Sequence, residues 1–560
     1  MKKAVFVLGV MYLISCSKTD APIVTPSQPP VVQEESIKFS TNLDTGILNA
    51  ADTLPLVISV SSTLPKNGIK YAITVNFVDS SKQIFKLDTN INLQSFSILI
   101  PMSNRAGNYN VGIVATSLST STNNITKSIS VVRQHFVINS SSIPLQIPGF
   151  STQDITTGID GSVSGTIYTM INGKEHLIVS PTLFFRTPLL PSLDFIKNGS
   201  NWTLYNYYTS GAMGAGRNYE LMDSAKQIWA ISDHGLEAST GTWPFGSIFV
   251  MKNNGNALTY DNISASRSFY HSVSTGDLNN DGLKDIVGLN MGTLGNWYGS
   301  LHPYLQNADG SFREARDLIN DGLNTWSINK GAGAVLVVDV LGDKRPEIIR
   351  ADYGLNLSYQ TQADRYSFVI YAYDNSLGKY TVQKNPGPLG VFSNNDRGST
   401  SIKALDFDND GDIDFAIATE GTNFMGIEIW KNDGQGNFTP TSNKLEYSFD
   451  QMQFREFNII DINEDGWPDI VLNPFAFGKL FRVGGSGNMN DWGTGGVSLN
   501  NLFWINNKGS FEIYNKSIIA PGIKPAYVKS AKINGKFKLI GVQTDFSKGT
   551  LNIYDIPFLF

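Results

Sequence analysis

The sequence predicts an all-β protein with more than one domain, and three observations support this. The chain has 560 residues and a mass of 61.3 kDa, which exceeds what one hydrophobic core usually supports. It combines 52 glycines and 11% aromatic residues with only 16% charged residues, a balance typical of turn-rich sheets. Short apolar runs also alternate with turn residues along most of the chain.

The charge balance excludes one class of partner. Lys and Arg total 43 against 49 Asp and Glu, which gives a net charge of −6, and no basic block occurs. Binding to nucleic acid depends on clustered positive charge that neutralises phosphates. We therefore expect no nucleic-acid partner.

The first fifteen residues predict an export signal. Two lysines precede a mostly apolar run at 4–15, which is too short to span a membrane but matches the core of a signal peptide. The run ends Leu13-Ile14-Ser15-Cys16, which resembles the bacterial lipobox. This resemblance implies that Cys16, the only cysteine in the chain, is lipidated as the first mature residue, at the bacterial outer membrane or cell surface. The lipid would then be the only membrane attachment. An ordinary cleaved signal with an incidental cysteine is the alternative.

Two segments follow the signal. Residues 16–35 hold four prolines among polar residues, which predicts an extended linker. Residues 36–135 contain β-branched runs such as Leu56–Val60 and Tyr71–Phe77, with turn residues every eight to fifteen positions. About seven strands in roughly 100 residues favour an immunoglobulin-like sandwich that acts as a spacer or docking piece.

Three later segments share a nine-residue spacing of oxygen-bearing side chains. Each has them at positions 1, 3, 5 and 9, and a glycine at position 6. Ca²⁺ takes six to eight oxygens, and such a loop supplies them from side chains and from the carbonyl of position 7. The candidate ligands are Asp277, Asn279, Asp281, Leu283 and Asp285; Asp406, Asp408, Asp410, Asp412 and Asp414; and Asp461, Asn463, Asp465, Trp467 and Asp469. The sequence therefore predicts bound Ca²⁺.

An EF-hand and a metal-free turn are the alternative interpretations of these loops. An EF-hand also needs a glutamate at position 12, but that position holds Gly288, Ile417 and Leu472. An apolar run follows each loop, so we place the loops between strands. Turns rich in Asp, Asn and Gly also occur without a metal. A fourth copy, Asp339–Glu347, lacks an acid at position 3 and the glycine, and is a poorer candidate.

A second recurring element defines the repeating unit. An aromatic strand, a polar turn and another aromatic follow each loop, as in Ile429–Phe438, which indicates a hairpin. Two further units have Asn172-Gly173 and Asn534-Gly535 where the acidic loop would stand, a pair typical of type I′ turns. Units start near 166, 218, 271, 333, 400, 454 and 526. Four antiparallel strands per unit predict a seven-bladed β-propeller over residues 146–560.

These loops and hairpins resemble FG-GAP/VCBS repeats, the blades of integrin α-subunit propellers and of many bacterial surface proteins. The resemblance is carried by the units that begin near 271, 400 and 454. It implies Ca²⁺ in the blade loops and a role in adhesion or ligand binding. Because the family spans lectin-like, scaffold and lyase proteins, it does not select one function.

The loops between the second and third strands of each unit are the candidate ligand surface, because they lie on the face opposite the metal loops. Their aromatic residues, set among Gly, Asn, Ser and Thr, are Trp243, Trp297, Tyr298, Phe424 and Trp492. Exposed rings stack on sugars, so we expect an extracellular glycan. A surface protein bound by the same face and a polysaccharide-degrading enzyme are the alternatives, as is simple packing of these rings. No catalytic motif is present, and we assign no catalytic residue.

Overall fold

The computed structural model describes the chain in a series of segments. These are 37–43, 53–78, 83–101, 107–119, 124–133, 139–152, 165–180, 191–208, 216–233, 246–255, 258–264, 269–290, 300–320, 331–353, 368–384, 397–421, 424–448, 454–474, 502–514, 527–545 and 548–556. Their regular elements are β-strands and the 3-10 turn η1 (Arg316–Leu318), as the predicted all-β class requires. No helix in these segments is long and apolar enough to cross a membrane. The chain divides into two compact units, centred on Thr53–Val131 and on Val132–Phe560.

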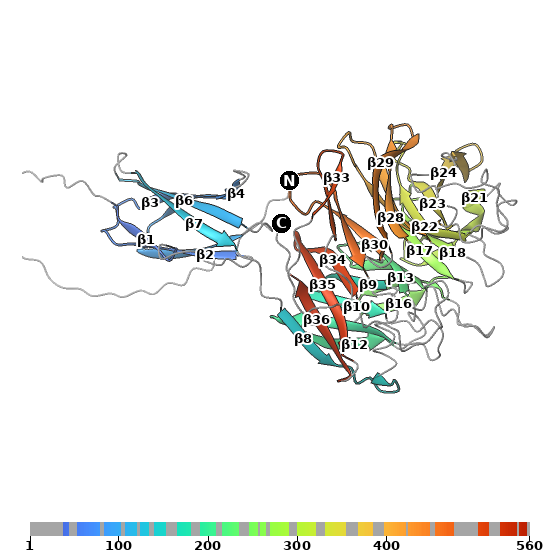
Figure 1. The fold of residues 1–560 in the computed structure, drawn as a ribbon, viewed down its shortest axis with the longest axis horizontal. Coiled ribbons are helices and arrows are strands. Elements are labelled where there is room, and N and C mark those ends of the chain that lie inside the picture. The colour runs from blue at the N-terminus through green and yellow to red at the C-terminus, as the bar shows by residue number, and fades with distance from the viewer. Residues whose placement is uncertain are drawn as a thin grey trace, which may run out of the picture. The chain divides into compact units, whose positions relative to one another are not determined.

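The first unit consists of two antiparallel sheets (Figure 1). One has the order β1 (Phe39–Thr41), β2 (Thr53–Val60), β5 (Ser95–Pro101); the other has the order β4 (Gln83–Ile91), β3 (Ile69–Phe77), β6 (Gly107–Ser117), β7 (Asn124–Arg133). Alternate residues of β3 are buried, as the period-two pattern predicts. The sheets pack through Tyr71 of β3, whose ring lies 5.0 Å from that of Phe96 on β5.

The described residues of the second unit form seven four-stranded antiparallel arrays, which we number sheets 1 to 7. Figure 1 labels most of their strands. Sheet 1 is β9 (Gly165–Ile171), β10 (Lys174–Ser180), β11 (Ser192–Asn198) and β12 (Asn201–Tyr208); sheet 2 is β13 (Gly216–Asp223), β14 (Ile228–Asp233), β15 (Ile248–Asn253) and β16 (Leu258–Asn262); sheet 3 is β17 (Tyr270–Gly276), β18 (Asp285–Asn290), β19 (Ser300–Gln306) and β20 (Phe312–Glu314). In each, consecutive strands pair in chain order, as hairpin connections predict.

The remaining four arrays continue this pattern. Sheet 4 is β22 (Gly331–Val338), β23 (Glu347–Tyr353), β24 (Phe368–Asp374) and β25 (Lys379–Lys384); sheet 5 is β26 (Arg397–Leu405), β27 (Asp414–Gly421), β28 (Phe424–Asn432) and β29 (Phe438–Ser448); sheet 6 is β30 (Phe454–Ile460), β31 (Asp469–Pro474), β32 (Phe503–Asn506) and β33 (Phe511–Ile513). Sheets 4 and 5 are joined by the bridge between Tyr353 and Gly398, and β21 (Ile319–Asn320) runs parallel to β25.

Sheet 7 is completed by a strand from far earlier in the chain. Its own strands are β34 (Tyr527–Ile533), β35 (Lys536–Asp545) and β36 (Thr550–Ile556), and β36 pairs antiparallel with β8 (Asn139–Pro144). The second unit therefore begins before residue 146, where the sequence placed its start. The predicted boundary missed β8 because its partner lies about 400 residues away in sequence, beyond the reach of local patterns.

The first strands of successive sheets contact one another. β9 contacts β13, β13 contacts β17, and the series continues through β22, β26 and β30 to β34. β34 in turn contacts β9, so the series returns to the sheet where it began. The first strands begin at 165, 216, 270, 331, 397, 454 and 527, each within three residues of a unit start expected from the sequence.

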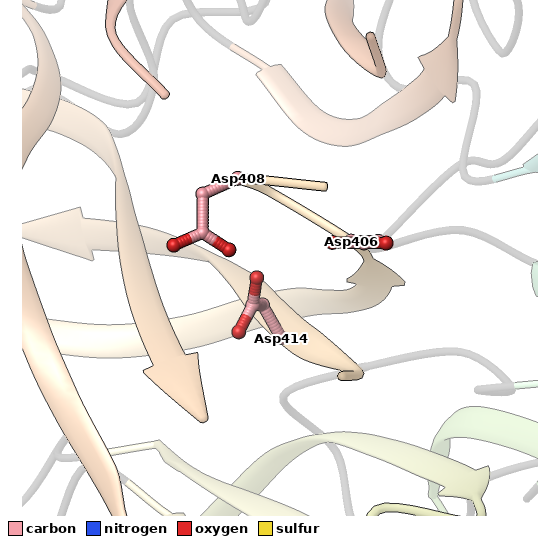
Figure 2. A group of neighbouring side chains, drawn as sticks. All are labelled: Asp406, Asp408 and Asp414. Atoms are coloured by element: carbon pink, nitrogen blue, oxygen red, sulfur yellow. The ribbon is translucent and has the colours of Figure 1, made fainter. Parts of the chain in front are cut away.

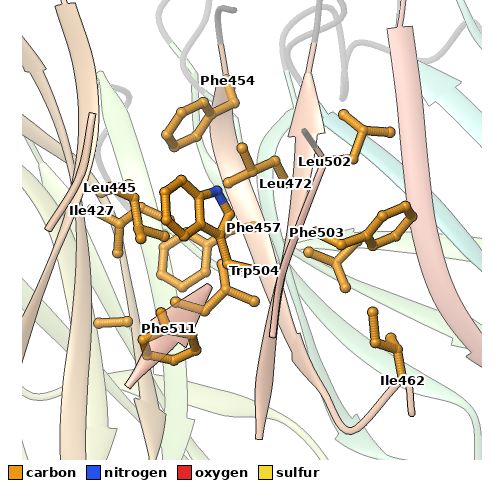
Figure 3. Close-up of a cluster of buried hydrophobic side chains, with 14 of the residues drawn as sticks. Ile427, Leu445, Phe454, Phe457, Ile462, Leu472, Leu502, Phe503, Trp504 and Phe511 are labelled. Carbon is orange, nitrogen blue, oxygen red and sulfur yellow. The ribbon is translucent and has the colours of Figure 1, made fainter. Parts of the chain in front are cut away.

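Apolar side chains fill the spaces between neighbouring sheets. One cluster joins residues of sheets 5, 6 and 7. Figure 3 shows Phe457 of sheet 6 in this cluster with Ile427 and Leu445 of sheet 5. Trp504 lies in the same cluster and donates its indole N–H to the Tyr447 hydroxyl at 2.5 Å, which satisfies a buried donor. Truncating a buried aromatic such as Phe457 to alanine costs about 3–5 kcal/mol. These seams hold the loops of adjacent sheets at fixed positions.

Candidate metal centres in three acidic loops

The three acidic loops join the first and second strands of sheets 3, 5 and 6. Strand β17 ends at Gly276 and β18 begins at Asp285; β26 ends at Leu405 and β27 begins at Asp414; β30 ends at Ile460 and β31 begins at Asp469. The paired strands are antiparallel in all three cases. The prediction that each loop lies between strands is confirmed.

The first aspartate of each loop organises the turn. In sheet 3, both oxygens of Asp277 accept backbone N–H groups, from Asp281 at 3.0 Å and from Gly282 at 2.8 Å. Asp406 and Asp461 bind the same two positions of their loops at 2.9–3.1 Å. The glycine at position 6 has φ of +84°, +94° or +92°, a conformation that favours glycine. This is the sharp bend that the spacing predicts.

The last aspartate of each loop clamps the loop to the hairpin of its own sheet. In sheet 5, Asp414 is fully buried and accepts N–H groups from Phe407 and Asn432, both at 2.7 Å. The equivalent bonds to Asp285 come from Leu278 and Gln306, and those to Asp469 come from Ile462 and Asn506. Each carboxylate is thus a ligand candidate and a structural link.

Burial and neighbouring charge disfavour the ionised form of these carboxylates. Burial raises the pKa of Asp285 and of Asp414 to about 6, and that of Asp469 to about 7. The other aspartates of each loop raise these pKa values further, whereas the backbone N–H groups lower them. A divalent cation would offset both the burial and the mutual repulsion.

The sheet 5 loop brings three carboxylates together (Figure 2). Asp406, Asp408 and Asp414 each offer an oxygen, and these oxygens lie within 4.8 Å of one another. Oδ1 of Asp408 is buried and has no hydrogen-bond partner among the residues that the structure describes. An all-oxygen donor set with an unsatisfied carboxylate oxygen fits Ca²⁺. When bound, the ion would supply positive charge and cross-link the loop.

Lys431 distinguishes the sheet 5 loop from the other two. Its ammonium contacts Asp408 and lies 3.1 Å from Asp410, and these carboxylates raise its pKa above the ordinary value. The residues that hold the same position in sheets 3 and 6, Leu305 and Ile505, carry no charge. The sheet 5 loop has five aspartates. Among the described residues of these three sheets, it is also the loop that binds a lysine.

The remaining predicted ligands lie in the loops and form hydrogen bonds within them. Leu283, Asp412 and Trp467 donate their backbone N–H to the aspartate at position 5 at 2.8–3.0 Å. Asn279 and Asn463 each donate a side-chain N–H to that same aspartate, Asp281 or Asp465. Coordination by the carbonyls of Leu283, Asp412 and Trp467 stays a prediction.

The fourth loop folds in the same way without the full donor set. Glu347 accepts N–H groups from Val340 and Leu341, and burial raises its pKa to about 7. The positive φ of position 6 is taken by Lys344, at +74°. Leu341, at position 3, packs against the sheet 5 hairpin at Gly436. The loop geometry therefore does not require a metal at every copy.

A set of inter-sheet hydrogen bonds escaped the sequence analysis. The carbonyl of position 2 in one loop accepts from a side chain of the next sheet: Val340 from Asn432 at 3.0 Å, and Phe407 from Asn506 at 2.8 Å. The carbonyl of Leu278 accepts from Arg345 and from the Tyr380 hydroxyl. The asparagine before each hairpin turn was the available signal. Loop closure is thereby coupled to the neighbouring sheet.

Several predicted functional residues lie outside the described segments. These are Cys16, Trp243, Trp297, Tyr298 and Trp492. Phe424 is the first residue of β28, but its side chain is outside the described part of the chain. The expected ligand surface and the lipid attachment therefore remain predictions.

Comparison with known proteins bears directly on the acidic loops. Residues 406–472 match the FG-GAP-like repeat family. The match contains the loops of sheets 5 and 6, and the resemblance seen in the sequence is confirmed over this segment. No curated protein sequence matches the chain.

Solved structures give only distant similarities. A tetra-tandem repeat in the extending region of a large adhesion protein has 9% identity and a TM-score of 0.15, covering 78% of this chain and 94% of that chain. Extracellular domains 1-2 of Drosophila Semaphorin 1a have 8% identity and a TM-score of 0.22, covering 77% of this chain and 85% of that chain. Neither carries an argument about fold or function at these scores.

Proposed function

We propose that the second unit is a seven-bladed β-propeller, stabilised by Ca²⁺, that serves as an extracellular binding module. The seven sheets are its blades. The contact of β34 with β9 and the pairing of β36 with β8 support closure of the propeller. Pairing the last blade with a strand from the start of the unit joins the two ends without a covalent link.

The observation that carries the calcium assignment is the shared geometry of three loops. Asp277, Asp406 and Asp461 all bind the same two backbone positions, and the buried carboxylates at position 9 all close the same hairpin. The unsatisfied oxygen of Asp408 supports a cation at this place. Calcium acts here on stability, because it removes repulsion among carboxylates that the fold holds together.

The binding surface is proposed on the loops between the second and third strands. Trp243, Trp297, Trp492 and their neighbours fall in these connections, which leave the sheets at the ends opposite the acidic loops. Aromatic rings on a rigid platform stack against the C–H faces of sugars, and amides there bind hydroxyl groups. An extracellular glycan is therefore the proposed ligand.

The first unit is proposed to be an immunoglobulin-like spacer between this module and a lipid anchor at Cys16. The strand orders β1-β2-β5 and β4-β3-β6-β7 support a sandwich in which the strand after β4 crosses to the other sheet. Intact mass measurement of the protein purified from membranes tests the anchor. A diacylglycerol-bearing Cys16 at the amino terminus supports it, and an unmodified cysteine overturns it.

A glycan array with the full chain tests the module. We expect binding that is lost in Trp297→Ala and Trp492→Ala while the melting temperature stays unchanged. Glu512→Ala, on an exposed strand position, is the control and keeps binding. Absence of binding to any glycan, with the protein folded and calcium-loaded, would overturn the glycan assignment.

A further inference from the structure

A cavity of about 210 Å³ lies between sheets 1 and 2, away from the acidic loops. His176 and Asp194 of sheet 1 line it, together with Lys174, Tyr205, Asn253 and Leu258. It is smaller than the clefts that hold drug-sized ligands, so it suits a ligand of about one sugar ring. Polar groups of several kinds converge on this space.

A buried histidine–carboxylate pair forms one wall. Nδ1 of His176 lies 2.9 Å from Oδ1 of Asp194, and the Tyr208 hydroxyl donates to Oδ2 of Asp194 at 3.2 Å. His176 is 5% exposed and Asp194 is fully buried. Nε2 of His176 has no hydrogen-bond partner within the described residues. The bond to Asp194 fixes the orientation of the ring, which lines the cavity.

Corresponding positions in sheets 3 and 5 hold apolar residues, whereas sheet 7 has the charged pair Lys538 and Asp555 there. In sheet 1 the second strand begins at Lys174, which pairs with Ile171, and His176 follows two residues later. The residue two positions after the start of the second strand is Val287 in sheet 3 and Ala416 in sheet 5. Asp194 pairs with Ile178, and its equivalents are Leu301 and Ile427. All four of these equivalents are buried.

Burial of this polar pair affects the stability of the fold. Burying a histidine and a carboxylate where sheets 3 and 5 use apolar residues lowers stability unless their hydrogen bonds are fully satisfied. A buried polar pair that lines a cavity is a candidate for ligand binding.

The rim adds an exposed ring and a free cation. Tyr205 is 53% exposed and its ring meets that of His176 edge to face, with centroids 5.8 Å apart. Lys174 is exposed and has no ion-pair partner in the described segments. Asn172 and Asn253 bind each other at 2.9 Å and hold the edge of the cavity together. The rim is thus rigid at one side and electropositive at the other.

We propose that this cavity is a second binding site, which takes a uronic acid, a sugar ring that bears a carboxylate. The Tyr205 ring would pack against the C–H face of the sugar, Nε2 of His176 would bind a hydroxyl, and Lys174 would pair with the carboxylate. The site is formed by the turn between β9 and β10 and the hairpin of sheet 2. It does not depend on the loops of the proposed glycan platform.

Saturation-transfer NMR and calorimetry on the full chain test this proposal with D-galacturonate and D-glucuronate. At least one uronate is expected to bind saturably, with the matching neutral sugar, D-galactose or D-glucose, at least tenfold weaker. Lys174→Met is expected to remove that preference, and Tyr205→Ala to weaken binding more than tenfold. Lys536→Met is the matched control, because Lys536 follows the same Ile-Asn-Gly turn in sheet 7.

Three results would overturn the site. One is no saturable binding of either uronate by the folded chain, and another is an unchanged preference in Lys174→Met. The third is loss of uronate binding in Trp297→Ala and Trp492→Ala, which would place the ligand on the platform instead. Uronate binding that survives in those two variants supports the cavity even if the glycan platform itself fails.

Discussion

Sheets 1 and 5 join the same two strands by different chemistry. Sheet 1 uses the two-residue turn Asn172-Gly173, with φ of +50° and +74°, as a type I′ turn requires. Sheet 5 uses a longer loop in which Asp406, Asp408 and Asp414 approach one another. The turn gains its shape from backbone preference, whereas the loop brings several carboxylates together. The proposed calcium would therefore act on the second kind of connection and not on the first.

The largest expected effect is that of a chelator on the whole chain. Each site occupied at 100 times its Kd contributes about 2.7 kcal/mol, so removing calcium from three loops lowers stability by roughly 8 kcal/mol. Scanning calorimetry with EDTA, and again after excess Ca²⁺, measures the loss and its recovery. A melting curve unaffected by EDTA would contradict the metal assignment and leave the loops as ordinary turns.

Asp469→Ala should have the next largest effect. It leaves the buried N–H groups of Ile462 and Asn506 unpaired, at about 1–3 kcal/mol each, and also removes a ligand. Urea unfolding should show a loss of roughly 2–6 kcal/mol. Glu512→Ala removes the same charge from an exposed position of sheet 6 and should leave the midpoint unchanged. Equal midpoints for the two variants would show that Asp469 is not a structural link.

Gly173→Ala and Gly466→Ala separate the two kinds of connection. Both glycines have positive φ, +74° and +92°, and open space where a Cβ would stand. Each alanine should cost about 1–2 kcal/mol in unfolding free energy. Only Gly466→Ala should also weaken calcium binding, because only that bend shapes a metal loop. Isothermal titration with Ca²⁺ checks this, and a weaker calcium affinity in Gly173→Ala would break the distinction.

Lys431→Met should have the smallest effect and the opposite direction. Lys431 is partly exposed, so its pairing with Asp408 and Asp410 is worth at most about 1 kcal/mol after solvent screening. Calcium affinity of the sheet 5 loop should therefore rise by up to about fivefold. The titration is cleanest in a chain that also carries Asp281→Ala and Asp465→Ala, which remove the other two sites. A fall in affinity would mean that Lys431 supports the site.

Local chemistry was predictable from the sequence. The acidic loops, the hairpins and the starts of the sheets follow from residues within about ten positions of one another. The Asn-Gly pair and the glycine at position 6 specify backbone conformations directly. For the same reason the fourth loop was correctly recognised as a copy, although Leu341 and Lys344 replace the usual residues.

Contacts between distant segments were not predictable in this way. Asn506 binds the Phe407 carbonyl across 99 residues, and the asparagine before the hairpin turn does not by itself identify its partner. His176 and Asp194 come from neighbouring strands, and their pairing depends on the register of β10 with β11. His176 by itself therefore gave no signal of a site in the sequence. Strand β8 was missed because its partner is the last strand of the chain.

The pairing of β8 with β36 has a consequence for how the protein is made. β8 is synthesised early, yet the edge that pairs with β36 is covered only when that strand has been made. Until then that edge can pair with a strand of another molecule. A polypeptide that ends before Thr550 would lack β36, and sheet 7 would then have exposed strand edges. Such truncated products should aggregate or be degraded.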